Sequence, residues 1–240
     1  MRKHKSYLTA ITVLALTLFS LIATCAPAAP SSAPLSETPP VTESPQQDQP
    51  TEEDTTEEPS ETSPTLTSIP MPSTTTKRAL FVIYEQFEET EYSKPRTILE
   101  DAGVVVSIAS SSLDTVKGHL GMRVKPDIVL SDVYATDYDA IVFIGGYGYD
   151  WNNREAHRIV KEAAAEGKVL AAICVAPMTL AKAGVLEDKR ATTSLPGSML
   201  EAEGAIYTGA MVERDELIIT AKGPAAARSF GETIALALEE

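Results

Sequence analysis

Nearly continuous apolar segments alternate with amphipathic segments between residues 77 and 240, and this alternation restricts the possible folds more than any other feature. A strand that is apolar along its whole length belongs in a parallel sheet whose two faces are both covered by helices. The alternation therefore predicts an α/β fold, a three-layer sandwich around a mostly parallel sheet. The expected strands are 78–84, 104–110, 138–146 and 168–174, with later ones at 205–209 and 216–221, and the expected helices are 92–103, 154–167, 177–184 and 224–240.

The first 25 residues have the pattern of an export signal. Three basic residues within the first five positions precede an uncharged apolar run, residues 7–24. The sequence LIATC at 21–25 resembles a bacterial lipobox, although Thr24 stands where glycine or alanine is preferred. We predict an extracytoplasmic lipoprotein of the cell envelope, anchored to the membrane through lipidated Cys25. An uncleaved membrane anchor and a secreted protein are the second and third alternatives.

Residues 26–76 differ in composition from the rest of the chain. They contain no aromatic residue, no Lys and no Arg, but nine acidic residues, and Pro, Ser and Thr make up much of the remainder. Such a segment offers no apolar face that would compensate for ordering its backbone. We therefore predict a disordered acidic linker between the membrane and a domain at 77–240.

The charge of residues 77–240 argues against a nucleic-acid partner. The whole chain carries −14, of which the first 25 residues contribute +3 and the linker −9, so −8 remains for the domain. The domain also shows no metal-ligand spacing, no phosphate-binding loop and no dinucleotide fingerprint. We expect neither a metal nor an organic cofactor.

Three features follow predicted strands, at the edge of the sheet where α/β proteins place their sites. One is Cys174 between an apolar strand and Pro177, which suits the first turn of a helix. A tight turn there would lift the thiol out of the sheet as a nucleophile elbow does, and free amides and a helix dipole would favour the thiolate. An inert core cysteine is the alternative, and the residues alone leave the two about even.

The other two features are a pair of glycines and a group of acids. Gly145 and Gly146 end the strand 138–146 and allow backbone amides to approach a ligand closely. Gly146 and the amide of Val175 could form an oxyanion hole, or the glycines could only make a turn. The acids follow the first strand, where one of them could lie buried beside the thiol with a raised pKa or simply face solvent; they are Glu88, Glu89 and Glu91.

Four stretches resemble, in order, the ThiJ/PfpI superfamily, which includes the parkinsonism-associated deglycase and intracellular proteases. They are KRALFVIYEQFEETEY, YDAIVFIGGYG, GKVLAAICVAPMTLAKAGVLEDKRATT and LIITAKGPAAARSF. The resemblance implies a flavodoxin-like fold of the class I glutamine amidotransferase type. It assigns the nucleophile to Cys174, the partner acid to Glu91 and the oxyanion amides to Gly146 and Val175.

The sequence also departs from that family at its histidines. The proteases have a histidine directly after the cysteine, where this chain has Val175, and the deglycase branch has one in a stretch where this chain has Ser194 and Leu195. Two of the remaining histidines do not fill the gap: His119 is expected in a peripheral hairpin or turn, and His157 on a helix surface. A histidine base for peptide hydrolysis is therefore missing.

Three functions are compatible with these residues. The first is a stress-protective enzyme of glyoxalase or deglycase type, which would act on small reactive carbonyls or on their protein adducts. The second is a redox-sensing module in which Cys174 is oxidised beside Glu91. The third is a PfpI-type peptidase or amidase, which ranks last. By analogy with the family a homodimer is possible, and the aromatic residues at 147, 149 and 151 could line the pocket, form an interface or anchor a loop.

Overall fold

The computed structural model describes residues 76–240. The predicted export signal, the lipidation of Cys25 and all but the last residue of the predicted linker lie outside these residues. Within the described range, none of the helices has the length and apolar character needed to cross a bilayer.

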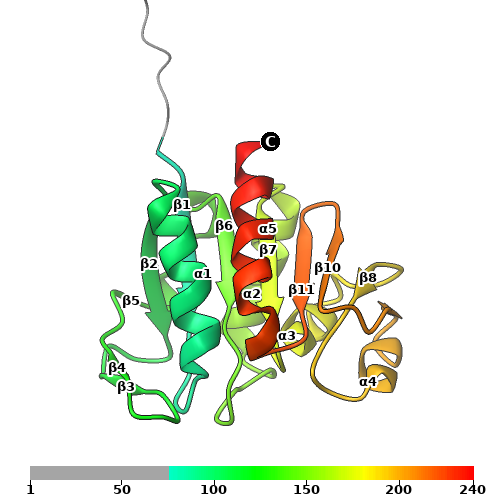
Figure 1. Ribbon diagram of the computed structural model, residues 1–240, viewed down its shortest axis with the longest axis horizontal. Coiled ribbons are helices and arrows are strands. Elements are labelled where there is room, and N and C mark those ends of the chain that lie inside the picture. The colour runs from blue at the N-terminus through cyan, green and yellow to red at the C-terminus, as the bar shows by residue number, and fades with distance from the viewer. Residues whose placement is uncertain (1–75) are drawn as a thin grey trace, which may run out of the picture. The chain divides into compact units, whose positions relative to one another are not determined.

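A parallel sheet forms the centre of the domain (Figure 1). Within residues 76–240 it has seven strands in the order β10-β11-β7-β6-β1-β2-β5. All neighbouring pairs are parallel except β10 and β11. The bounds are β1 Arg78–Val82, β2 Val105–Ser110, β5 Ile128–Val129, β6 Ala140–Phe143, β7 Val169–Ile173, β10 Val212–Asp215 and β11 Ile218–Ala221.

Helices cover both faces of the sheet, which confirms the predicted three-layer α/β sandwich. Helices α1 (Glu89–Asp101) and α5 (Ala227–Glu239) lie in front of the sheet in Figure 1, and α2 (Arg154–Ala165) and α3 (Pro177–Lys182) lie behind it. Strand β1 is buried on both sides because its alternate residues belong to different cores. Leu80 packs in the core that contains α2 and α3, and Phe81 packs in the core that contains α1 and α5.

The smaller elements frame the carboxyl edge of the sheet. A hairpin of β3 (Val116–Lys117) and β4 (Arg123–Val124) follows β2, and it contains His119 as expected. The predicted strand 205–209 is not part of the main sheet: β9 (Ile206–Tyr207) pairs with β8 (Arg190–Ala191) in a separate two-stranded sheet. Strand β10, which the sequence analysis did not predict, takes the edge position beside β11. The remaining elements are α4 (Gly197–Glu201) and the 3₁₀ turns η1 (Leu130–Asp132), η2 (Ala135–Asp137) and η3 (Pro224–Ala226).

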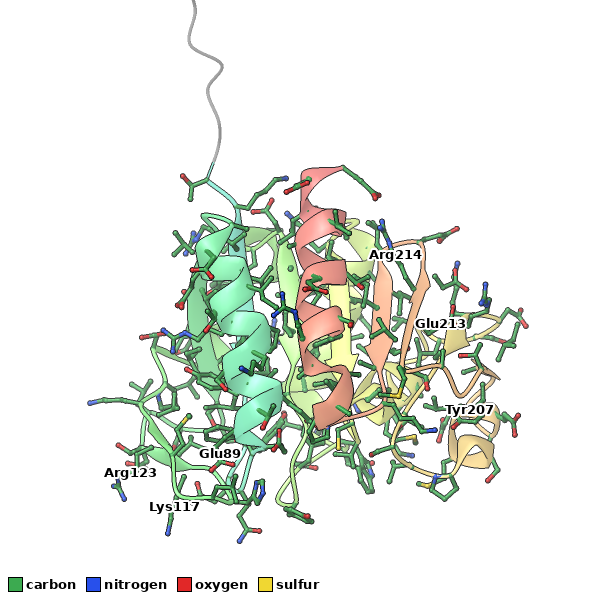
Figure 2. The ribbon with its side chains drawn as sticks, in the orientation of Figure 1. Glu89, Lys117, Arg123, Tyr207, Glu213 and Arg214 are labelled. Carbon is green, nitrogen blue, oxygen red and sulfur yellow. The ribbon has the colours of Figure 1, made fainter. Side chains whose placement is uncertain are left out.

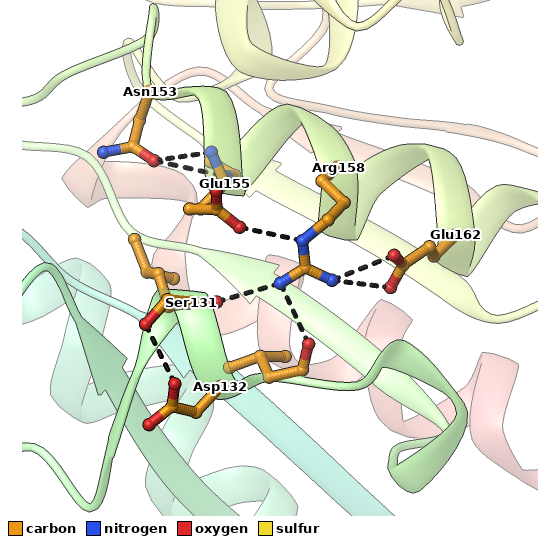
Figure 3. A network of polar contacts seen from close by, with 9 residues as sticks. Ser131, Asp132, Asn153, Glu155, Arg158 and Glu162 are labelled. Atoms are coloured by element: carbon orange, nitrogen blue, oxygen red, sulfur yellow. Dashed lines mark hydrogen bonds and ion pairs between the residues drawn. The ribbon is translucent and has the colours of Figure 1, made fainter.

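Arg158 fastens α2 to the loop that precedes β6 (Figure 3). Its guanidinium pairs with Glu155 at 2.8 Å and with Glu162 at 2.9 Å on its own helix. It also donates hydrogen bonds to the backbone oxygens of Leu130 and Val133, at 3.1 and 3.0 Å. Each of the three guanidinium nitrogens therefore donates a hydrogen bond, which is the arrangement expected of an arginine that stabilises the fold.

Candidate active site

The three features that follow β1, β6 and β7 meet in one pocket at the carboxyl edge of the sheet. The pocket has a volume of about 250 Å³. Parallel strands all end at the same edge, so residues far apart in sequence come together there. The lining residues are Glu88, Glu91, Gly146, Tyr147, Cys174, Val175, Ser194 and Pro224.

Cys174 lies directly after β7 in a left-handed backbone conformation, with φ of +66°. Such a φ is uncommon for a residue with a Cβ and persists only where surrounding contacts hold it. Here the Cys174 N–H donates to Ala221 O at 2.9 Å, and its carbonyl accepts from Ser194 N–H at 2.9 Å and from the Thr193 hydroxyl at 2.7 Å. The sharp strand-to-helix turn predicted from the sequence is present, and it brings the sulfur to the pocket wall.

Glu91 is fully buried on the first turn of α1 and lines the same pocket. The Glu88 side chain caps this helix by accepting the Glu91 N–H at 2.7 Å. Neither carboxyl oxygen of Glu91 accepts a hydrogen bond of good geometry among the described residues. Burial, followed by the nearby Glu88 carboxylate, raises the pKa of Glu91 to about 8, against a smaller lowering by the Cys174 thiol and the Gly145 amide. Glu91 is therefore mostly protonated at neutral pH.

The double glycine lets the loops after β1 and β6 approach each other closely. A Cβ on Gly145 would lie 2.6 Å from the Cys174 Cβ and 2.8 Å from Glu91 Oε2. A Cβ on Gly146, which has a φ of +149°, would lie 2.4 Å from the backbone oxygen of Gln86. The two loops are joined by hydrogen bonds from Glu88 N–H to Gly145 O, at 3.0 Å, and from Tyr147 N–H to Gln86 O, at 3.1 Å. A side chain at either position would clash with these neighbouring atoms, so glycine is required at both.

Ser194 lies beside the sulfur, at a position where the sequence indicated only a missing histidine. Its hydroxyl lies 3.3 Å from Cys174 Sγ. The resemblance left Ser194 and Leu195 as alternatives for the position; of these two, Ser194 lines the pocket. The sequence signal that could have found it was the alignment of the ATTS stretch with the family's histidine.

The protonation state of Cys174 differs from the prediction. We expected free amides and a helix dipole to favour the thiolate, but the pKa of Cys174 is raised to about 11. Burial is the largest cause and the charge of Glu91 the second, and the Ser194 hydroxyl and the Val175 amide oppose them. Helix α3, from Pro177 to Lys182, is short, and desolvation of the half-buried sulfur outweighs its terminus. The resting thiol is therefore protonated.

The other polar and aromatic side chains lie outside the pocket or at its rim. The His157 Nε2 lies 2.8 Å from the backbone oxygen of Trp151, and His119 Nδ1 lies 3.0 Å from Glu89 Oε2. Neither histidine lines the pocket. Tyr147 does line it and is 79% exposed, whereas Tyr149 and Trp151 pack against the core and anchor the loop.

The fold and this site define a class of α/β domains with a cysteine at the carboxyl edge of a parallel sheet. The chain belongs to the DJ-1/PfpI family, whose model matches residues 77–237. An uncharacterized protein of Methanocaldococcus jannaschii is 36% identical over 170 residues, which cover 68% of this chain and 83% of that protein. A deglycase of Pyrococcus horikoshii is 33% identical over 153 residues, 62% of this chain and 91% of the relative.

A solved structure shows the same fold. The crystal structure of a ThiJ/PfpI domain protein from Brachyspira murdochii superposes with a TM-score of 0.66 and is 28% identical. The match covers 68% of this chain and 97% of that one. The family and fold expected from the four sequence stretches are thereby confirmed.

Proposed function

We propose that the domain is an enzyme that converts small α-oxoaldehydes, such as methylglyoxal, with Cys174 as nucleophile and Glu91 as proton donor and acceptor. The observation that carries this proposal is the fully buried Glu91 carboxyl, without a hydrogen-bond partner of good geometry among the described residues, beside the Cys174 thiol. A buried carboxyl group without a hydrogen-bond partner costs stability, and groups with such perturbed pKa values gather at catalytic sites. The deglycase name of the Pyrococcus relative is consistent with carbonyl chemistry.

The reaction balances without an external cofactor. The Cys174 sulfur bonds to the aldehyde carbon while Glu91, as carboxylate, takes the thiol proton and passes it to the aldehyde oxygen, which gives a thiohemiacetal. Glu91 then takes the proton from that carbon and returns it to the neighbouring carbon, while the hydroxyl proton of the thiohemiacetal passes to the ketone oxygen. The first carbon is thereby oxidised to a thioester and the ketone is reduced to an alcohol. Water cleaves the carbon–sulfur bond, lactate leaves and the thiol regains its proton.

The remaining pocket groups suit the charges of this route. A pKa of about 8 leaves Glu91 able to act as both base and acid near neutral pH. The amides of Gly146 and Val175 are candidates to stabilise the oxyanion that forms during thioester hydrolysis. The Ser194 hydroxyl, 3.3 Å from the sulfur, can donate to the departing thiolate. The small pocket favours short aldehydes over peptides.

A redox-sensing role is the second candidate, and the pair of hydrogen-bond donors around the sulfur favours it. A protonated Glu91 and the Ser194 hydroxyl could both donate to the oxygens of a Cys174 sulfenate or sulfinate formed by peroxide. A peptidase would need a base of histidine type, and the pocket is lined by none. We therefore do not favour peptide hydrolysis.

Turnover of methylglyoxal by the full chain tests the enzyme proposal. A Cys25→Ser background leaves Cys174 as the single thiol, because the chain has two cysteines. Lactate formation should disappear in Cys174→Ala and fall about 10²-fold or more in Glu91→Gln. Equal turnover by the background protein and Cys174→Ala would refute the enzyme. If lactate is absent from all three while mild peroxide adds oxygen to Cys174, the sensor role is favoured instead.

A further inference from the structure

Glu89 is buried at the start of α1, but it faces the β3–β4 hairpin and not the Cys174 pocket. In Figure 2, Glu89 lies at the end of α1 nearest the hairpin that carries Lys117 and Arg123. Its Oε1 accepts the backbone N–H groups of Leu120 at 2.6 Å and Met122 at 3.3 Å. The backbone of the hairpin therefore folds around one oxygen of this carboxylate.

The second carboxylate oxygen of Glu89 has no such partner. Only 6% of Glu89 is exposed, and its Oε2 is buried and accepts no hydrogen bond of good geometry among the described residues. That oxygen nevertheless lies 3.0 Å from His119 Nδ1. A buried carboxylate oxygen without a donor or a cation is unfavourable, so an electropositive group is needed at this point.

A third ligand atom is close to these two. One carboxylate oxygen of Glu88, one of Glu89 and a ring nitrogen of His119 all lie within 4.8 Å of one another. Glu88 uses one oxygen to cap α1 through the Glu91 N–H, and a carboxylate has a second. Two ligands bound at about 2.1 Å to one ion lie about 3 Å apart at a right angle and about 3.4 Å apart at a tetrahedral angle, so the 3.0 Å between Glu89 Oε2 and His119 Nδ1 is at the short end of this range.

We propose that Glu88, Glu89 and His119 bind one divalent transition-metal ion of the Zn²⁺ class, beside the Cys174 pocket that Glu88 also lines and without Cys174 as a ligand. An imidazole with two carboxylates suits such ions, and open coordination positions would be filled by water. The ion supplies the positive charge that Glu89 Oε2 lacks and holds the hairpin against α1. This site departs from our expectation of no metal, because its ligands come from segments about thirty residues apart and form no spacing motif.

The competing arrangement is a simple ion pair. His119 Nδ1 also lies 3.4 Å from the backbone oxygen of Phe87, so a protonated ring could share its Nδ1–H between Phe87 and Glu89. A ring held in that way has no lone pair on Nδ1 for a metal. The two arrangements therefore predict opposite results when metal is added.

Calorimetric titration with Zn²⁺ distinguishes them. The full chain is purified in the Cys25→Ser background, stripped with chelator and titrated, together with Glu89→Gln, His119→Ala and Cys174→Ala. We expect one ion per chain in the background protein and in Cys174→Ala, and binding at least about 10²-fold weaker in both Glu89→Gln and His119→Ala. His119 is on the surface, so its variant should fold, and circular dichroism checks Glu89→Gln.

The spectrum of bound Co²⁺ provides a second measurement. Ligation by oxygen and nitrogen should give d–d bands without the sulfur-to-metal charge-transfer band that a thiolate produces. The absence of saturable binding in the background protein would overturn the proposal in favour of the ion pair. Binding that survives in His119→Ala would also overturn it. So would a sulfur band in the background protein, if that band and the binding both disappear in Cys174→Ala.

Discussion

Arg158 and Glu91 are both ionisable residues that the fold partly or fully encloses, and their surroundings are opposite. The guanidinium of Arg158 is bound by two carboxylates and two backbone oxygens (Figure 3). The carboxyl group of Glu91 is fully buried, with neither oxygen in a hydrogen bond of good geometry among the described residues. The pKa of Arg158 is accordingly raised by its acidic partners, and that of Glu91 is raised by burial.

Arg158 is therefore a residue that stabilises the fold, and Glu91 is one whose burial lowers the stability of the fold. A buried polar group whose bonds are all made contributes to stability, while one left without partners opposes it. We therefore expect Arg158 to matter for unfolding and not for chemistry, and Glu91 to matter for chemistry at the expense of stability. The four predictions below test this contrast.

The largest effect should be on turnover. Glu91→Gln keeps the shape of the side chain but cannot accept a proton, so methylglyoxal conversion should fall about 10²-fold or more. Arg158→Met, measured in parallel at a temperature where both proteins are folded, should keep its turnover within about threefold. A comparable loss in both variants would end the distinction between the two sites.

The pH dependence of stability should change next. The pKa of Glu91 is near 4.5 in the unfolded chain and about 8 in the folded one, so the folded state binds the extra proton between these values. The stability that this extra proton contributes is thus fully present below about pH 4.5 and is lost as pH rises through about 8, about 5 kcal/mol in all. Urea unfolding should show this decline in the native protein and not in Glu91→Gln.

A matched control for that measurement is Glu155→Gln. Glu155 is a partly exposed carboxylate in the Arg158 network, so its replacement should leave the alkaline decline in stability unchanged. If Glu91→Gln and the native protein lose stability in parallel from about pH 5 to pH 8, the raised pKa is wrong.

Removing the guanidinium should destabilise the fold by a smaller amount. Arg158→Met retains the apolar stem but removes the guanidinium donor from the carbonyls of Leu130 and Val133. The free energy of unfolding should fall by about 2 kcal/mol, measured by urea denaturation at neutral pH. Arg158→Lys should recover only part of it, because an ammonium cannot reach all four partners at once. An unchanged midpoint in Arg158→Met would show that the network is not stabilising.

The smallest effect should come from Ser194. Its hydroxyl lies 3.3 Å from the sulfur and lowers the pKa of Cys174, against the larger effect of burial. Ser194→Ala should raise that pKa further and slow alkylation of Cys174 by iodoacetamide a few-fold at about pH 8. Unfolding should be nearly unaffected. Faster alkylation in Ser194→Ala would mean that the serine shields the thiol instead of activating it.

The layers of the fold could be predicted from sequence because apolar periodicity reports burial directly. Strand β1 and helix α2 lie close to the predicted ranges for this reason. The failures are at short elements whose partners are tertiary. Residues 206–207 pair with β8 and not with the main sheet. Strand β10 contains the charged residues Glu213 and Arg214, so it lacks the apolar pattern by which the other strands were predicted (Figure 2).

The candidate site was predictable as a list of residues and not as an electrostatic environment. The order of strands places Cys174, Glu91 and Gly146 at one edge, and the family resemblance selected Glu91 among three neighbouring acids. The raised pKa of Cys174 depends on how deeply the sulfur is buried, and the function of Ser194 depends on a 3.3 Å contact. A local sequence pattern predicts neither the burial of the sulfur nor the distance between the Ser194 hydroxyl and the sulfur.

The left-handed backbone at Cys174 affects which amino acids evolution can place at this position. A φ of +66° is held against the preference of any residue with a Cβ, at about 1 kcal/mol, whereas glycine adopts it freely. The strain at this turn favours glycine, while the packing of the half-buried Cys174 side chain against the core favours cysteine by a similar amount. Stability alone therefore selects cysteine only weakly at this position, and the chemistry of the thiol is what distinguishes it from other small residues there.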